Sequence, residues 1–295
     1  MQIRKYVFTA ALTVTSRFTQ VRDLLQGRIG PVARDRRARK LWFGPSIESE
    51  ETRCTIRSGN NTLDAYFVKP AASPVQAVVL ICHGIGETVE HWLPVQRLFA
   101  ANGVATLVFD YSGYGRSTGW AGGPQCERDA VAAFERLQGL MPGCPVMLLG
   151  YSLGSGIAAS IVRRVNADRL ILCAAFTSFR AAAQSIGFPK FLALTLPDLW
   201  RAEQNLRDHH APVLIVHGER DELFPVTMAE ELASYCRSEL VVVPNMTHNQ
   251  PFYAPDIAYW GLILSRLTAK GNGNDSPVDL VVELQSGITA NSQQE

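Results

Sequence analysis

A serine in the middle of the chain lies in the spacing that many enzyme nucleophiles have. Residues 150–154 read Gly-Tyr-Ser-Leu-Gly, a G-x-S-x-G pattern centred on Ser152. The apolar residues before the motif predict a buried strand, and the small residues after it suit a closely packed helix. A sharp turn between strand and helix exposes the serine hydroxyl, and a side chain at Gly150 or Gly154 would clash with the neighbouring strand or helix. The pattern predicts a nucleophile, with an ordinary turn serine as the alternative.

A serine hydroxyl needs a base to take its proton, and that base needs an acid to orient it. Asp221 follows one apolar strand-like run, and His248 follows the last such run in the chain. In open parallel sheets, ligands bind beyond the carboxyl ends of the strands, where both residues are expected. We therefore predict that Ser152, Asp221 and His248 form a catalytic triad. Glu219 and Glu222 are nearby rivals for the acid, and a solvated loop residue is the alternative for either partner.

An acyl-transfer site also needs amide donors for the negative charge that develops on the substrate oxygen. The N–H of Leu153, directly after the nucleophile, is one expected donor, and the loop Gly84-Ile85-Gly86 supplies the other. We assign the second donor to Ile85, with Gly86 as the alternative. Gly84, Gly86 and Tyr151 are also predicted to contact substrate.

Two further histidines, His83 and His217, each precede a glycine at the end of an expected strand. That position suits a hydrogen bond that shapes the turn, so neither is predicted to be the base.

Continuous apolar runs alternate with helical patterns along most of the chain. Strands are expected at 77–82, 105–109, 146–149, 169–176, 212–217 and 239–244, helices at 91–102, 126–140, 227–236 and 254–270, and a hairpin at 52–68. Strands that are apolar on both faces and alternate with helices predict an α/β fold, with a mostly parallel sheet covered on both faces.

The chain of 295 residues divides by composition into three parts. Residues 1–46 form a basic arm and linker, 47–270 the expected domain, and 271–295 a polar tail expected to be mostly disordered. Within the arm, residues 1–25 have an amphipathic helical pattern, which fits either an anionic membrane surface or docking on the domain itself. A signal peptide is disfavoured because the apolar stretch is short and no cleavage site follows.

The net charge and the cysteine pattern argue against several classes of function. The net charge of +1 gives no case for nucleic-acid binding. The six cysteines are scattered without a C-x-x-C pair, so we expect reduced thiols and no metal site. No apolar run approaches the length of a membrane-spanning helix. A cytoplasmic protein is expected, with peripheral membrane contact as one interpretation of the arm.

The longest departure from the alternation is the segment 177–211, which is expected to form a small lid over Ser152. Phe179 and Phe188 are predicted to line an apolar acyl pocket under it. Other apolar residues of the segment share that prediction: Ile186, Phe191, Leu192, Leu194 and Leu196. The alternative for these side chains is that they only pack the lid onto the sheet.

Five motifs occur in an order that is found in one known superfamily. They are H-G-x-G at 83–86, D-x-x-G-x-G-x-S at 110–117, G-x-S-x-G at 150–154, H-G-x-x-D at 217–221 and the late His248. In these motifs residues 50–270 resemble the α/β-hydrolase superfamily, most closely its serine-aminopeptidase-like and monoacylglycerol-lipase-like group. The sequence Phe-Thr-Ser-Phe at 176–179 is similar to the Bem46-like branch. The resemblance implies a serine hydrolase without a cofactor that acts on esters or thioesters.

The function predicted from these observations is hydrolysis of a small carboxylic ester or thioester with an apolar acyl group. An acyltransferase that uses the same triad is the main alternative. A peptidase is disfavoured because no acidic cluster marks a site for a free amine, and a non-catalytic binding protein is disfavoured by the complete triad. The oligomeric state is not predicted.

Overall fold

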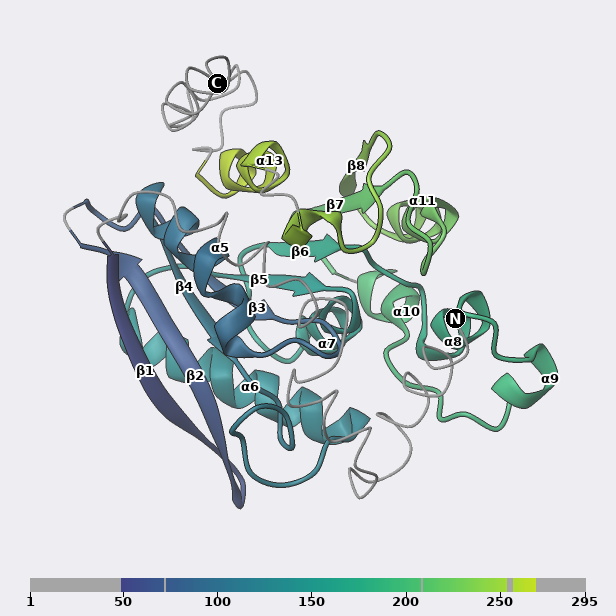
Figure 1. Cartoon of the computed structure of the whole chain (residues 1–295), viewed down its shortest axis with the longest axis horizontal. Coiled ribbons are helices and arrows are strands. Elements are labelled where there is room, and N and C mark those ends of the chain that lie inside the picture. Colours follow the sequence, from purple (N-terminus) through teal and green to yellow (C-terminus); the bar gives the residue numbers. More distant parts are fainter. Residues whose placement is uncertain (1–48, 72, 208, 254–256, 269–295) are drawn as a thin grey trace, which may run out of the picture.

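The computed structural model describes residues 49–71, 73–207, 209–253 and 257–268. The predicted basic arm and polar tail, including the amphipathic pattern at 1–25, lie outside these residues. The described chain forms an eight-stranded sheet with helices on both sides (Figure 1).

The strands alternate with helices as expected from the apolar runs. In chain order the strands are β1 (Ser49–Ser58), β2 (Asn61–Pro70), β3 (Ala77–Cys82), β4 (Val104–Phe109), β5 (Val146–Tyr151), β6 (Leu170–Cys173), β7 (Val213–Gly218) and β8 (Ser238–Val243). Their spatial order is β1-β2-β4-β3-β5-β6-β7-β8. The pairs β1–β2 and β2–β4 are antiparallel, and all later pairs are parallel. The α/β fold predicted from the sequence is confirmed.

Helices cover the sheet on two sides because each inner strand is apolar on both faces. In β3, Val78 and Leu80 belong to one buried cluster, whereas Val79 and Ile81 belong to the other. The first cluster packs against α6 (Gly123–Leu140) and α7 (Leu153–Ile161). The second packs against α5 (Val89–Ala101) and α13 (Ile257–Thr268). This packing buries the central strands on both faces.

The segment predicted as a lid contains three short helices, α8 (Phe179–Ser185), α9 (Lys190–Ala193) and α10 (Ala202–Arg207). The remaining helices are α11 (Val226–Tyr235) and α12 (Gln250–Tyr253). Trp200 packs the segment onto α7, since a Cβ at Gly156 would lie 2.9 Å from the Cβ of Trp200. Figure 1 shows α8 and α9 at the right-hand side of the molecule, away from the β1–β2 hairpin.

One strand is shorter than the sequence predicts. The expected run of 169–176 ends at Cys173, because Ala174 has a φ of 47° and turns the chain out of the sheet. The chain thereby leaves β6 next to the turn that carries the serine, whose N–H donates to the carbonyl of Cys173 at 2.9 Å.

Candidate active site

Ser152 occupies the turn between β5 and α7. Its φ of 52° and ψ of −116° are unusual for a residue other than glycine, and such strain is concentrated at functional sites. A Cβ at Gly150 would lie 2.6 Å from the Cα of Ser155, and a Cβ at Gly154 would lie 2.8 Å from the carbonyl oxygen of His83. The turn therefore requires both glycines, as the sequence predicts.

The structure brings the three predicted triad residues together from loops that are far apart in the sequence. Nε2 of His248 lies 2.9 Å from the Oγ of Ser152, and Nδ1 of His248 lies 2.7 Å from Oδ2 of Asp221. The three residues are between 4% and 9% exposed. An imidazole between a hydroxyl and a carboxylate is the arrangement by which a serine is activated.

The hydrogen bonds, rather than the spacing of residues in the sequence, show which of the three acids contacts His248. Asp221 accepts two backbone hydrogen bonds on its other oxygen, from Leu223 at 2.9 Å and Phe224 at 2.8 Å. Burial by itself raises the pKa of Asp221. The hydrogen bond from His248 and the neighbouring charges outweigh burial, so the pKa lies below its ordinary value. Asp221 is therefore held ionised, as an orienting acid must be.

The two rival carboxylates bind the backbone of the histidine loop instead. Glu219 accepts from the N–H of Asn245 at 2.8 Å, and Glu222 accepts from the N–H of His248 at 3.0 Å. Both side chains belong to exposed residues. All three acids of this loop thus act on the segment that carries the imidazole, but only Asp221 contacts the ring.

Tyr151 belongs to the buried cluster on the α5 side of the sheet. Its ring packs edge-on against Trp92 and Phe252, with centroid distances of 5.9 and 4.8 Å, and its hydroxyl donates to the backbone carbonyl of His248. The structure thus shows a contact to the base, and the predicted contact of Tyr151 with substrate stays a prediction.

The loop predicted to supply the second oxyanion donor is held by a buried histidine. Nδ1 of His83 lies 2.8 Å from the carbonyl oxygen of Gly84, and because a carbonyl can only accept, Nδ1 carries the proton. Burial lowers the pKa of His83 to about 4, so the ring is neutral. In a trans peptide the C=O and N–H point in opposite directions, so the N–H of Ile85 points away from the His83 ring.

The other donor belongs to the start of α7. Leu153 is the first residue of that helix, where backbone N–H groups have no intrahelical acceptor. Both predicted donors thus lie on backbone that its surroundings fix.

The second turn-forming histidine lies behind the acid. Nε2 of His217 lies 2.9 Å from the carbonyl of Phe224 and 3.5 Å from Oδ2 of Asp221. Burial lowers its pKa, so the ring is neutral. His217 shapes the loop after β7, as predicted for it and for His83.

In the segment 177–211, which is predicted to be a lid, some apolar residues are buried and others are exposed. Phe179 is fully buried and packs against Trp200 at a centroid distance of 5.7 Å, whereas Phe188 is half-buried against the same cluster. Three others are exposed, at 73%, 40% and 72% for Phe191, Leu192 and Leu194. Phe179 is thus an anchor of the segment, and a substrate contact for it or for Phe188 stays a prediction.

Sequence reasoning overlooked one polar side chain beside the oxyanion loop. Glu87 is 3% exposed, although a glutamate between two loop residues would be expected to be solvated. Its place directly after the H-G-x-G motif was the only signal for it.

No cluster of three or more metal-ligating side chains occurs in the part of the chain that the structure describes. Within the same part, no helix is long and apolar enough to cross a membrane. The six cysteines all fall within the described ranges, and there each is a free thiol.

Comparison with known proteins finds sequence similarity to hydrolases. Residues 73–202 match the family model described as serine aminopeptidase, S33. The uncharacterized protein Rv2307c of Mycobacterium tuberculosis is 30% identical over 178 residues, which cover 59% of this chain and 63% of that protein.

Two relatives carry more informative names. The mouse lysophosphatidylserine lipase ABHD12 is 28% identical over 189 residues, which cover 57% of this chain and 48% of the lipase. Protein bem46 of Schizosaccharomyces pombe is 29% identical over 203 residues, which cover 64% of this chain and 67% of bem46. The matched region thus spans roughly half to two thirds of these relatives.

A solved structure supports the fold independently. The esterase Pf2001 of Pyrococcus furiosus superposes with a TM-score of 0.62 at 18% identity, covering 75% of this chain and 93% of the esterase. At that identity the likeness concerns the fold alone.

Proposed function

Since the chain is a member of the α/β-hydrolase superfamily, we propose that it is a serine hydrolase that cleaves carboxylic esters through an acyl-enzyme on Ser152. The observation that carries this proposal is the continuous line of contacts from Ser152 through His248 to Asp221, at 2.9 and 2.7 Å. The relative named as a lysophosphatidylserine lipase supports ester bonds as the substrate class.

In the first half of the reaction the Oγ of Ser152 attacks the ester carbonyl carbon while its proton passes to Nε2 of His248. The amides of Leu153 and Ile85 bind the oxyanion of the tetrahedral intermediate. Collapse of the intermediate breaks the bond to the leaving alcohol, which takes the proton from His248. Asp221 stays ionised throughout and stabilises the imidazolium.

In the second half, water replaces the alcohol. It attacks the acyl carbon as His248 takes one of its protons, and collapse of the second intermediate releases the carboxylic acid and returns the proton to Ser152. A thioester would react in the same way with a thiol as leaving group. No step requires an added cofactor.

Hydrolysis of p-nitrophenyl esters from acetate to palmitate tests this proposal. We expect activity in the wild type and in Ser160→Ala, and none above background in Ser152→Ala. Ser160 is the matched control because it lies on α7 and donates only to the carbonyl of Gly156, at 2.8 Å. Equal activity of the wild type and Ser152→Ala would overturn the assignment of the nucleophile.

A further inference from the structure

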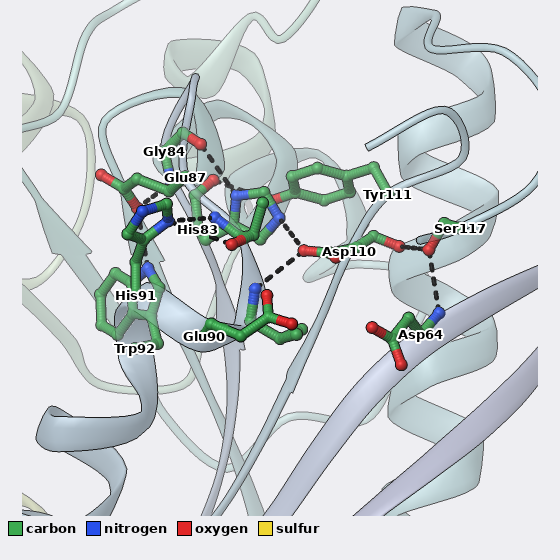
Figure 2. Close-up of polar contacts among 12 residues, drawn as sticks. Asp64, His83, Gly84, Glu87, Glu90, His91, Trp92, Asp110, Tyr111 and Ser117 are labelled. Carbon is green, nitrogen blue, oxygen red and sulfur yellow. Dashed lines mark hydrogen bonds and ion pairs between the residues drawn. The ribbon is translucent and has the colours of Figure 1, made fainter. Parts of the chain in front are cut away.

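Glu87 is a buried carboxyl group that the proposed reaction does not use. It lies between the oxyanion loop and α5, and its neighbours include the buried ring of Trp92 (Figure 2). A buried carboxyl group is costly unless it is hydrogen-bonded, so its contacts indicate what it does.

One oxygen of Glu87 accepts two hydrogen bonds. Oε2 lies 2.8 Å from the backbone nitrogen of Gly84 and 2.7 Å from Nε1 of Trp92. The Trp92 ring is itself fixed, because it packs edge-on against Phe252 and Trp260 at centroid distances of 5.0 and 5.6 Å. Glu87 therefore links the loop to a buried aromatic cluster of the core.

Gly84 is thereby held from both of its peptide groups. Its N–H donates to Glu87, and its carbonyl accepts from the ring of His83 at 2.8 Å. The second of these peptide groups also contains the N–H of Ile85. Gly86, with a φ of +75°, follows directly and lets the chain turn towards α5. The direction of the Ile85 N–H thus depends on two buried side chains.

The carboxyl group of Glu87 packs closely against the backbone of Gly84. A Cβ at Gly84 would lie 2.7 Å from Oε1 of Glu87 and 3.0 Å from its carboxyl carbon. A residue with a shorter or differently placed acceptor would leave the Gly84 amide without a partner, in a place from which water is excluded.

We propose that Glu87 is a positioning residue of the oxyanion hole, which fixes the Ile85 amide through its hydrogen bond to Gly84. This inference rests on the proposed function, because it assigns a purpose to a donor of that reaction. This role depends on the length of the Glu87 side chain and on the position of its acceptor oxygen, and not on its charge.

Two substitutions distinguish the effect of side-chain length from the effect of charge at position 87. In Glu87→Gln the amide oxygen can accept from both donors, and the side chain carries no charge. In Glu87→Asp the carboxyl group remains, but the side chain is one methylene group too short to reach both donors. We expect Glu87→Gln to keep kcat within about threefold of the wild type. We expect Glu87→Asp to lose at least about tenfold in kcat at unchanged KM, part of the 100- to 1,000-fold that removal of a whole oxyanion donor costs.

A second readout distinguishes positioning from general damage. A trifluoromethyl ketone forms a tetrahedral adduct whose oxyanion occupies the same hole, so its inhibition constant should rise in Glu87→Asp by the factor that kcat falls. Glu90→Asp is the matched control, since Glu90 is an exposed glutamate in the first turn of α5.

Wild-type kcat in Glu87→Asp, or a loss in Glu87→Gln as large as in Glu87→Asp, would overturn the inference. Labelling of wild-type Ser152 by a fluorophosphonate keeps this outcome separate from the proposed function. A wild type that labels and hydrolyses esters while Glu87→Asp is unimpaired refutes only the role of Glu87. A wild type that neither labels nor hydrolyses esters refutes the hydrolase proposal, and with it the role that depends on it.

Discussion

The hydroxyl of Tyr151 donates a hydrogen bond to the backbone carbonyl of His248, and so joins the residue before the nucleophile to the residue proposed as its base. The N–H of the same histidine donates to Glu222 at 3.0 Å. Both backbone groups of His248 are therefore fixed by side chains, independently of the Asp221 contact to the ring.

Removal of the Tyr151 hydroxyl should loosen the base without changing the nucleophile. In Tyr151→Phe we expect kcat to fall several-fold at unchanged KM, and the free energy of unfolding to fall by about 1 kcal/mol for the lost hydrogen bond. Steady-state kinetics and urea denaturation measure the two effects. Tyr235→Phe is the control, because its hydroxyl binds Glu231 on the surface of α11. Equal kinetics in the two variants would contradict a positioning role for Tyr151.

The choice among the three loop acids is open to a direct test. Asp221→Asn should lower kcat/KM by about 10³- to 10⁴-fold, since an amide favours the wrong tautomer of the imidazole. Glu219→Gln should change it little, because an amide oxygen can still accept from the N–H of Asn245. The account is contradicted if Glu219→Gln is impaired as much as Asp221→Asn.

Burial of Glu87 predicts a pH-dependent stability. Burial raises its pKa from an ordinary value of 4.5 to about 7, against the opposing effects of the Gly84 and Trp92 hydrogen bonds and of His248. Between these two pH values the folded state binds more protons than the unfolded state, so its free energy of unfolding falls as pH rises through this window.

Glu87→Gln does not titrate and should lack this loss. Relative to the wild type it should gain stability from pH 4.5 to 7, by on the order of 3 kcal/mol in total, with no further gain above pH 7. Urea denaturation of both proteins at a series of pH values measures the difference. A difference that does not vary with pH would show that Glu87 titrates as an exposed acid does.

The second glycine of the elbow offers a test of packing. In Gly154→Ala the added methyl group would overlap the backbone carbonyl of Cys82, the last residue of β3, and would lie 2.8 Å from the carbonyl oxygen of His83, so α7 must move away from the end of β3. We expect a loss of about 1–3 kcal/mol in stability, the usual cost of overpacking, together with a loss of activity. Gly139→Ala is the control on α6, where a Cβ would meet nothing within 4 Å and should be neutral or stabilising. Similar melting temperatures for both variants would contradict the described turn.

The sheet and the grouping of Ser152, Asp221 and His248 follow from the sequence because each residue lies in the turn or loop after an apolar run. Parallel strands bring their carboxyl ends to one edge, so the order of the motifs is enough to predict that they meet. The lengths of the strands are less predictable. Ala174 ends β6 early through a positive φ, which no residue type in that run indicates.

The finer roles depend on where side chains point. Asp221, Glu219 and Glu222 are equivalent by composition, and only the path of the loop after β7 decides which one reaches the imidazole. The ring of Tyr151 packs on the α5 side, because successive residues of a strand point to opposite faces. A contact of Tyr151 with substrate stays a prediction. In the sequence, Glu87 cannot be distinguished from a solvated glutamate. Only the packing of Trp92 around it shows that it is buried.

The central claim is that Ser152 is the nucleophile of an acyl-enzyme, and the most direct measurement is the mass of peptides after reaction with a fluorophosphonate probe. The account predicts one adduct per chain, located on the peptide that contains Ser152, with loss of ester hydrolysis in proportion to labelling. It also predicts no adduct in Ser152→Ala. An adduct on another residue, or undiminished hydrolysis by a fully labelled protein, would contradict it.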